Sequence, residues 1–156
     1  MMVVREATPA DREWIANLLR ERWHGTMIAA HGEIIDVLEL PALIADDQRG
    51  LATWLRTRAN AELMTLDAVP TGCGTGTALI EALVARLREQ GCEQLYLTTT
   101  NDNLSALRFY MRRGFRLVAL RPGAVDEARK QKPSISLVGQ FGIPIHDEIE
   151  LCLALN

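Results

Sequence analysis

Apolar residues recur at helical spacing in three stretches of the chain. The strongest helix is predicted over residues 77–90, where Gly91 supplies a stop signal. Its apolar stripe is Leu79, Ile80, Leu83, Val84 and Leu87. An earlier helix is predicted to begin in residues 8–11, whose Thr-Pro-Ala-Asp sequence is typical of a helix start. A third helix is predicted over residues 104–113.

Alternation of apolar and polar residues predicts the strands. It is clearest in residues 148–155, and the remaining strands are predicted at residues 2–6, 43–45, 51–58, 62–69, 94–100 and 115–120. Residues 24–41 keep no clean period and receive no assignment, whereas the charged run 126–132 predicts a short exposed helix before Pro133. This mixed order predicts an α/β (α+β) fold with helices packed on the faces of one sheet.

Composition narrows the class of protein. The 156 residues fit a single domain over residues 1–156, with a formal net charge of −3. That charge offers no long-range attraction to nucleic acid or to an anionic membrane, so we expect neither as a partner. The N-terminal residues contain no apolar run typical of a signal peptide. Three cysteines without CxxC or CxxH spacing predict no metal site and favour a reducing cytoplasm.

A glycine loop, Gly72-Cys73-Gly74-Thr75-Gly76, lies between a predicted strand and the strongest helix. Uncovered backbone N–H groups at a helix N-terminus suit a phosphate or pyrophosphate. A Rossmann loop requires GxGxxG after the first strand, and a P-loop requires a lysine; neither matches here. A tight turn without a ligand remains the alternative.

A second motif connects this loop to one family. Residues 103–115, Asn-Leu-Ser-Ala-Leu-Arg-Phe-Tyr-Met-Arg-Arg-Gly-Phe, resemble the Asn-x-x-Ala-x-x-Phe/Leu-Tyr-x-x-x-Gly-Phe signature of the GNAT superfamily of N-acyltransferases. The glycine loop resembles the Gln/Arg-x-x-Gly-x-Gly/Ala motif of the same family, except that Thr71 stands in place of Gln or Arg. The resemblance spans nearly the whole chain. It implies a mixed, mostly antiparallel central sheet of about six to seven strands with helices on both faces.

The resemblance also implies acetyl-CoA as cosubstrate, with its pyrophosphate on the glycine-loop amides and its pantetheine arm along the strand that ends at Val69. The implied cofactor-binding residues are Leu66, Ala68, Val69, Gly72, Cys73, Gly74, Thr75, Gly76, Thr77, Asn103, Ala106 and Tyr110. From the sequence alone, Asn103 is a helix cap. Arg108 and Arg112 are best interpreted as solvated helix charges, although they lie one turn apart and a phosphate contact is conceivable.

Acyl transfer from a thioester to an amine needs a proton acceptor for the amine, donors for the oxyanion and a proton for the thiolate. The resemblance assigns the last task to Tyr110, whose phenol is neutral at pH 7. A main-chain N–H of the strand ending at Val69 is the expected oxyanion donor. Asp67 is the candidate base, with Glu62 or water as alternatives; in an unbroken strand the two carboxylates face opposite sides. The preferred interpretation of each carboxylate, from the sequence alone, is a solvated strand residue.

The remaining expectations concern reactivity and partners. Cys73 is interpreted as a small loop residue whose amide matters, because His24, His31 and His146 are too scattered to predict a Cys–His pair. Acceptor recognition is expected in residues 23–41 and 121–146. The acceptor is a small-molecule or protein amine, and the chain a monomer or homodimer. The alternative function is a non-catalytic acyl-CoA sensor of the same fold.

Overall fold

The computed structural model describes residues 2–69 and 74–156. Within these ranges a seven-stranded sheet has the order β1-β4-β5-β6-β7-β9-β8, and only its β6–β7 pair is parallel. Its strands are β1 (Val4–Glu6), β4 (Ala42–Ala45), β5 (Gly50–Thr57), β6 (Asn60–Ala68), β7 (Gln94–Thr100), β8 (Arg116–Arg121) and β9 (Glu148–Ala154). The predicted α/β fold class is confirmed.

Helices cover both faces of the sheet, as expected. Four α-helices are described, namely α1 (Arg12–Trp23), α2 (Thr75–Glu89), α3 (Leu104–Arg112) and α4 (Ala124–Gln131). α2 buries its predicted stripe in the larger core cluster, together with Tyr110 and Phe115. α1 packs on the opposite face in a second cluster with Ile44 and Leu51. None of the described helices is long and apolar enough to cross a membrane.

The unassigned segment 24–41 forms a small hairpin of its own. Strand β2 (Met27–Ala30) pairs with β3 (Glu33–Asp36) around the two-residue turn His31–Gly32. Both turn residues have positive φ, 53° and 76°, as a type I′ turn requires. The 3-10 turn η2 (Val37–Glu39) then leads into β4. The hairpin was missed because its apolar residues do not alternate with polar ones, and His-Gly is a weaker turn signal than Asn-Gly.

β6 contains an irregularity that the sequence did not reveal. Pairing with β5 runs from Leu51↔Asp67 to Thr53↔Thr65, then shifts so that Trp54 lies opposite Leu63. Met64 is the extra residue of this bulge. Glu62 and Asp67 consequently lie opposite Leu55 and Leu51, which are four positions apart on β5 and share a face. The expectation that they face opposite sides is wrong, because it assumed an unbroken strand.

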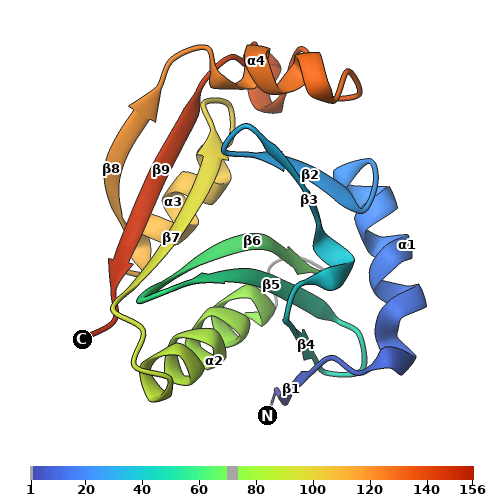
Figure 1. The fold of residues 1–156 in the computed structure, drawn as a ribbon, viewed down its shortest axis with the longest axis vertical. Helices are drawn as coiled ribbons and strands as arrows, with labels where there is room; N and C mark the ends of the chain where they lie inside the picture. Colours follow the sequence, from blue (N-terminus) through green and yellow to red (C-terminus); the bar gives the residue numbers. More distant parts are fainter. Residues whose placement is uncertain (1, 70–73) are drawn as a thin grey trace.

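The sheet opens between its two central strands. The β6–β7 pairing covers only Asn60 to Leu63 of β6 and Gln94 to Leu97 of β7, although both strands continue. Figure 1 shows them close together at one end and diverging towards the other, with the β2–β3 hairpin passing over the divergence. The edge of β6 beyond Leu63 is therefore left without a neighbouring strand on the β7 side. This opening positions the candidate site.

Candidate active site

Three cavities adjoin one another through the divergence of β6 and β7. The α2–α3 cleft, of about 570 Å³, lies between the N-terminus of α2, the end of β6 and the side of α3. The inter-strand gap, of about 120 Å³, shares Leu66, Asn103, Ala106 and Tyr110 with that cleft. The roofed pocket, of about 290 Å³, lies beneath the β2–β3 hairpin, α4 and residues 134–136, and shares Trp23, Met64 and Thr98 with the gap. The inter-strand gap thus shares lining residues with each of the other two cavities.

The start of α2 lines the α2–α3 cleft with the described part of the glycine loop. Gly74 precedes the helix with φ of 79°, and Ala78 makes the first α-helical bond, to the Gly74 carbonyl at 3.0 Å. The N–H groups of Thr75, Gly76 and Thr77 precede that bond and so have no helical partner. Free N–H groups of this kind, together with the helix dipole, suit an anion. Gly72 and Cys73 lie outside the described residues.

Gly76 also has a packing role. A Cβ at this position would lie 3.1 Å from the Phe109 ring, so the glycine allows α3 to approach α2. The Phe109 ring in turn carries the guanidinium of Arg113, 3.6 Å from its centroid. The motif glycine and the motif phenylalanine thereby shape the same wall of the cleft.

The β6 edge supplies main-chain groups to the cleft. The Val69 N–H donates to the Arg49 carbonyl at 2.7 Å, so it points towards the β5 side. Since N–H directions alternate along a strand, those of Leu66 and Ala68 point to the opposite side, towards the gap. Leu66 and Ala68 line the cleft. The Val69 N–H is used within the sheet and its side chain packs against the α1 cluster, and the cofactor contacts of all three residues stay predictions.

α3 brings three motif residues to the junction of cleft and gap. Asn103 caps the helix, its Oδ1 accepting from the Ala106 N–H at 3.2 Å, and both residues line the two cavities. The predicted capping role of Asn103 is therefore confirmed. Tyr110 lies two helical turns after Asn103 on the same face of α3. It also lines both cavities and is 9% exposed.

The pKa values of both Tyr110 and Asp67 are raised in the folded protein. Burial, and secondarily the Asp67 charge, raise the pKa of the Tyr110 phenol well above its ordinary value. Burial raises the pKa of Asp67, while the Trp23 hydrogen bond and the Arg22 charge oppose that shift. Trp23 Nε1 donates to the Asp67 carboxylate at 2.9 Å. A neutral phenol and a carboxylate of increased basicity thus line the same cleft.

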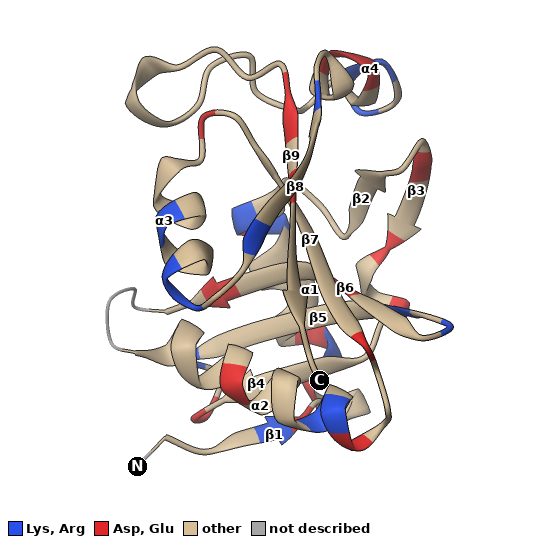
Figure 2. Ribbon diagram, turned by 90° about the vertical axis from the view of Figure 1, so that its left-hand side faces the viewer, with Lys and Arg blue, Asp and Glu red and all other residues tan. Residues whose placement is uncertain are grey.

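Several residues lining the cleft were missed. Arg113 donates from Nε to the Thr77 hydroxyl at 3.1 Å and from Nη1 to the Phe109 carbonyl at 2.8 Å, which holds a cation beside the N-terminus of α2. Figure 2 shows that α3 carries basic residues and no acidic ones. Arg22 and Gln140 reach the cleft from α1 and from the segment before β9. Arg108 and Arg112 do not line it, which agrees with their interpretation as solvated charges.

The roofed pocket draws on both segments expected to recognise the acceptor. Trp23, His24 and His31 come from the first segment, and Val125, Lys132 and Ile145 from the second. Glu62 lies here rather than in the cleft, and its carboxylate contacts His31 Nε2 at 2.7 Å. His146 instead pairs with Asp126 on α4. Across residues 2–69 and 74–156, no three His, Cys, Asp or Glu side chains gather as a metal site would need.

Comparison of this chain with known proteins identifies its family. The family model described as "Acetyltransferase (GNAT) family" matches residues 49–115, from the start of β5 through the glycine loop to the end of the α3 motif. The uncharacterized protein YxbD of Bacillus subtilis (strain 168) is 36% identical over 93% of this chain and 94% of its own length. This chain belongs to the GNAT acetyltransferase family.

Solved structures support the same GNAT fold. The IAA acetyltransferase from Bacillus cereus ATCC 14579 superimposes with a TM-score of 0.72 at 21% identity, covering 99% of both chains. The structure of yncA from Salmonella typhimurium with its cofactor acetyl-CoA gives a TM-score of 0.69 at 20% identity, covering 100% of this chain and 95% of that one. The resemblance inferred from the two motifs is therefore confirmed, and the chain is a GNAT N-acetyltransferase.

Proposed function

We propose that this GNAT protein transfers an acetyl group from acetyl-CoA to a primary amine by direct attack on the thioester. The observation that carries the proposal is the inter-strand gap, which shares Tyr110 with the α2–α3 cleft and shares Thr98 with the roofed pocket. A thioester reaching the gap from the cleft would meet an amine arriving from the pocket. The opening of the sheet between β6 and β7 would therefore serve to bring the two substrates together.

The cleft suits the charged and polar parts of CoA. The first-turn N–H groups of α2 would hold the pyrophosphate, as the family resemblance implies for Gly74 to Thr77. Arg113 adds a fixed cation beside these groups that would attract the pyrophosphate. The outward N–H groups of Leu66 and Ala68 would pair with the pantetheine arm or meet the thioester oxygen.

The chemistry follows from groups at the junction. The amine nitrogen attacks the thioester carbonyl carbon, and the oxygen that becomes negative is stabilised by a main-chain N–H of the β6 edge. The C–S bond then breaks, and Tyr110 donates its phenolic proton to the leaving thiolate sulfur. The proton lost by the amine passes to Asp67, directly or through water. Tyrosinate recovers its proton from solvent or from that same carboxylate.

Asp67 is preferred to Glu62 as the proton acceptor. Asp67 lines the cleft beside Tyr110, and burial raises its pKa, which makes it a better base than an exposed aspartate. The Trp23 N–H occupies one carboxylate oxygen, Oδ2, and fixes its orientation. Both Glu62 oxygens instead lie within 3.0 Å of His31 Nε2.

The test compares Tyr110→Phe with Tyr96→Phe, a tyrosine whose hydroxyl donates to Gln94 outside the cleft and gap. We expect Tyr110→Phe to lower kcat by about 10²-fold or more, the usual contribution of a general acid, and to keep its thermal stabilisation by acetyl-CoA. Thiol release with an amine library measures the first quantity and a thermal shift the second. Unchanged turnover and pH profile would refute the general-acid role.

The same measurements separate catalysis from a sensor function. Stabilisation by acetyl-CoA without turnover of any amine would favour the non-catalytic sensor. If acetyl-CoA does not raise the melting temperature, the cofactor assignment itself is wrong.

A further inference from the structure

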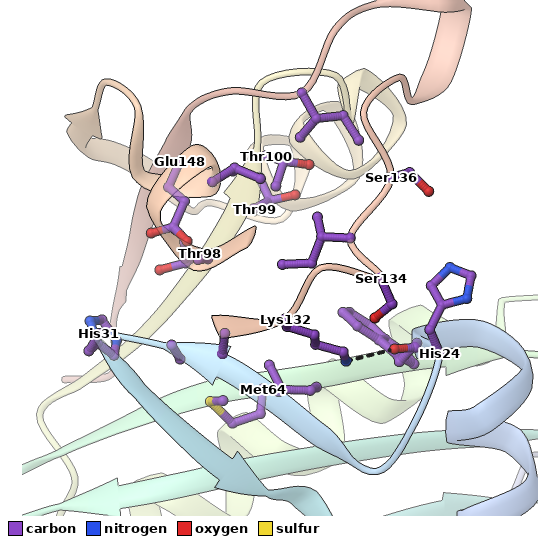
Figure 3. A pocket seen from close by; sticks show the side chains of 18 of the residues that line it. His24, His31, Met64, Thr98, Thr99, Thr100, Lys132, Ser134, Ser136 and Glu148 are labelled. Carbon is purple, nitrogen blue, oxygen red and sulfur yellow. Dashed lines mark hydrogen bonds between the residues drawn. The ribbon is translucent and has the colours of Figure 1, made fainter. Parts of the chain in front are cut away.

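Charged groups are segregated within the roofed pocket. Glu62, Glu148 and His31 lie at one end, and Lys132 lies at the other, with apolar side chains between them. Figure 3 shows Glu148 and Thr98 together on the side of His31, while Lys132 lies beside Ser134 and His24. The two ends therefore offer an acceptor different chemistry.

Glu148 is the carboxylate available at the acidic end. It pairs with Thr100 across the β7–β9 ladder and so shares a sheet face with Thr98 and Thr100. No hydrogen bond to its carboxylate is present among the described residues, whereas His31 occupies both oxygens of Glu62. Burial raises the pKa of Glu148, with Arg121 and His31 opposing the shift. A bound cation would relieve this desolvated charge.

Thr98 adds a second observation at the same place. Its Oγ1 is buried and has no hydrogen-bond partner in the described part of the protein. Thr98 lines both the roofed pocket and the inter-strand gap. A buried hydroxyl without a partner carries an energetic cost that a ligand N–H would remove. The Thr98 hydroxyl and the Glu148 carboxylate could both accept hydrogen bonds from the nitrogen of a bound ligand.

Arg22, His24 and Lys132 are the basic side chains that line the pocket besides His31, and Lys132 is largely occupied by the backbone. Lys132 Nζ donates to the Met27 carbonyl at 2.7 Å and to the Trp23 carbonyl at 3.1 Å, so it ties the end of α4 to the start of the hairpin. These bonds occupy two of its three N–H donors. Burial also lowers the pKa of Lys132. It therefore acts as a tether more than as a receptor for a carboxylate.

The middle of the pocket limits the size and polarity of the acceptor. Ile28, Met64, Val125 and Ile145 line it, and the hairpin and residues 134–136 cover it. A volume of about 290 Å³ is at the lower end of the range for small-ligand pockets. The space suits a compact apolar body and leaves little room for an extended polypeptide.

We propose that the acceptor is a compact primary amine with an apolar body and no carboxylate, its ammonium received between Glu148 and Thr98 at the mouth of the inter-strand gap. This inference rests on the proposed acetyltransferase function. Glu148 is here a binding residue for the acceptor, distinct from Tyr110 and Asp67.

The test uses 2-phenylethylamine, L-phenylalanine and an alanyl tetrapeptide as acceptors, with thiol release from acetyl-CoA as the measurement. We expect kcat/KM for 2-phenylethylamine to exceed that for L-phenylalanine at least tenfold, because the two differ only in a carboxylate. Glu148→Gln should raise the KM for 2-phenylethylamine about tenfold or more, which corresponds to about 1.4 kcal/mol. The KM for acetyl-CoA should stay unchanged. Thr98→Val provides a second variant with a smaller effect in the same direction.

The matched control is Glu127→Gln, the same change on the exposed face of α4. Equal kinetics of Glu148→Gln and Glu127→Gln, or a preference for phenylalanine or the peptide, would overturn the inference and leave acetyl transfer intact. The inference would also be overturned if 2-phenylethylamine were not acetylated and calorimetry showed no binding of it to the CoA-saturated protein. Failure of acetyl-CoA to stabilise the protein would instead refute the proposed function.

Discussion

Asp67 shows how one residue can combine a functional role with a cost in stability. The residue is 7% exposed, and its carboxylate is held by one indole N–H. Burial disfavours the ionised form, so the pKa of Asp67 is higher in the folded chain than in the unfolded one. At neutral pH the charge therefore destabilises the fold, and this penalty disappears as the pH falls below the pKa of the unfolded chain.

We predict that Asp67→Asn lowers kcat by about 10²-fold, the usual contribution of a general base. The acidic limb of the pH–rate profile should also disappear, because the titrating group has been removed. The melting temperature at pH 7 should stay the same or rise, since an amide oxygen still accepts from Trp23 without carrying a charge. The difference in melting temperature should shrink on acidification.

The control for this prediction is Trp23→Phe, which removes the hydrogen-bond donor and keeps the carboxylate. It should raise the pKa of Asp67 further and move the acidic limb of the profile to higher pH. An unaltered pH–rate profile in Asp67→Asn would assign the base to water or to another residue.

At the residue scale, the sequence identified the parts of the site that belong to contiguous motifs. Asn103, Ala106 and Tyr110 follow one another on a single helix, so their spacing alone places them on a shared wall. Arg22 and Gln140 reach the cleft from segments far away along the chain, and no local pattern could have linked them to it. The sequence placed Arg113 only at the end of the helix predicted over residues 104–113, because its contact with Thr77 depends on how α2 and α3 pack.

At the element scale, the segment between α4 and β9 connects the two ligand cavities. Its residues 134–136 cover the roofed pocket, and Gln140 lines the α2–α3 cleft. The Gln140 N–H donates to Asp102 Oδ2 at 3.0 Å, and Asp102 also accepts from the Thr100 hydroxyl. A Cβ on Gly139 would overlap the Asp102 carboxylate, so only glycine allows this docking.

We predict that Gly139→Ala lowers stability by about 1–3 kcal/mol, the usual cost of forcing extra atoms into a packed site. The KM for acetyl-CoA should rise several-fold, because Gln140 moves away from the cleft. Urea unfolding and initial rates measure the two effects.

A double-mutant cycle tests the cause. In an Asp102→Ala background the Gly139→Ala change should cost less, since the overlapping carboxylate is gone. Additive costs would show that the clash is not the reason.

The helices were easier to predict than the details of the strands. The helices predicted over residues 77–90, 104–113 and 126–132 were found within about two residues at their ends, and the predicted start in residues 8–11 became a 3-10 turn that leads into α1. The β2–β3 hairpin has neither alternation nor a strong turn signal. The bulge at Met64 leaves no trace in the apolar pattern, because it depends on pairing with β5, and so the shared face of Glu62 and Asp67 was not predicted.

At the scale of the whole molecule, the strand and helix order indicated the fold class but not the opening in the sheet. The motif resemblance supplied a mostly antiparallel sheet of six to seven strands, and seven are present among the described residues. The short pairing of β6 with β7 could not be read from either strand, since both continue as strands, to Ala68 and Thr100, after their pairing ends at Leu63 and Leu97. The gap between the two strands results from the angle at which β6 and β7 diverge, which neither strand's own sequence specifies.

The separation of the two cavities has a consequence for the order of substrate binding. Acetyl-CoA would enter between α2 and α3 and the amine beneath the hairpin, so the binding of one substrate does not block the binding of the other. We predict a random sequential mechanism. Free CoA should compete with acetyl-CoA alone, and the acetylated product with the amine alone. Detection of amine binding only after acetyl-CoA has bound would show instead that one ligand must shape the entrance used by the other.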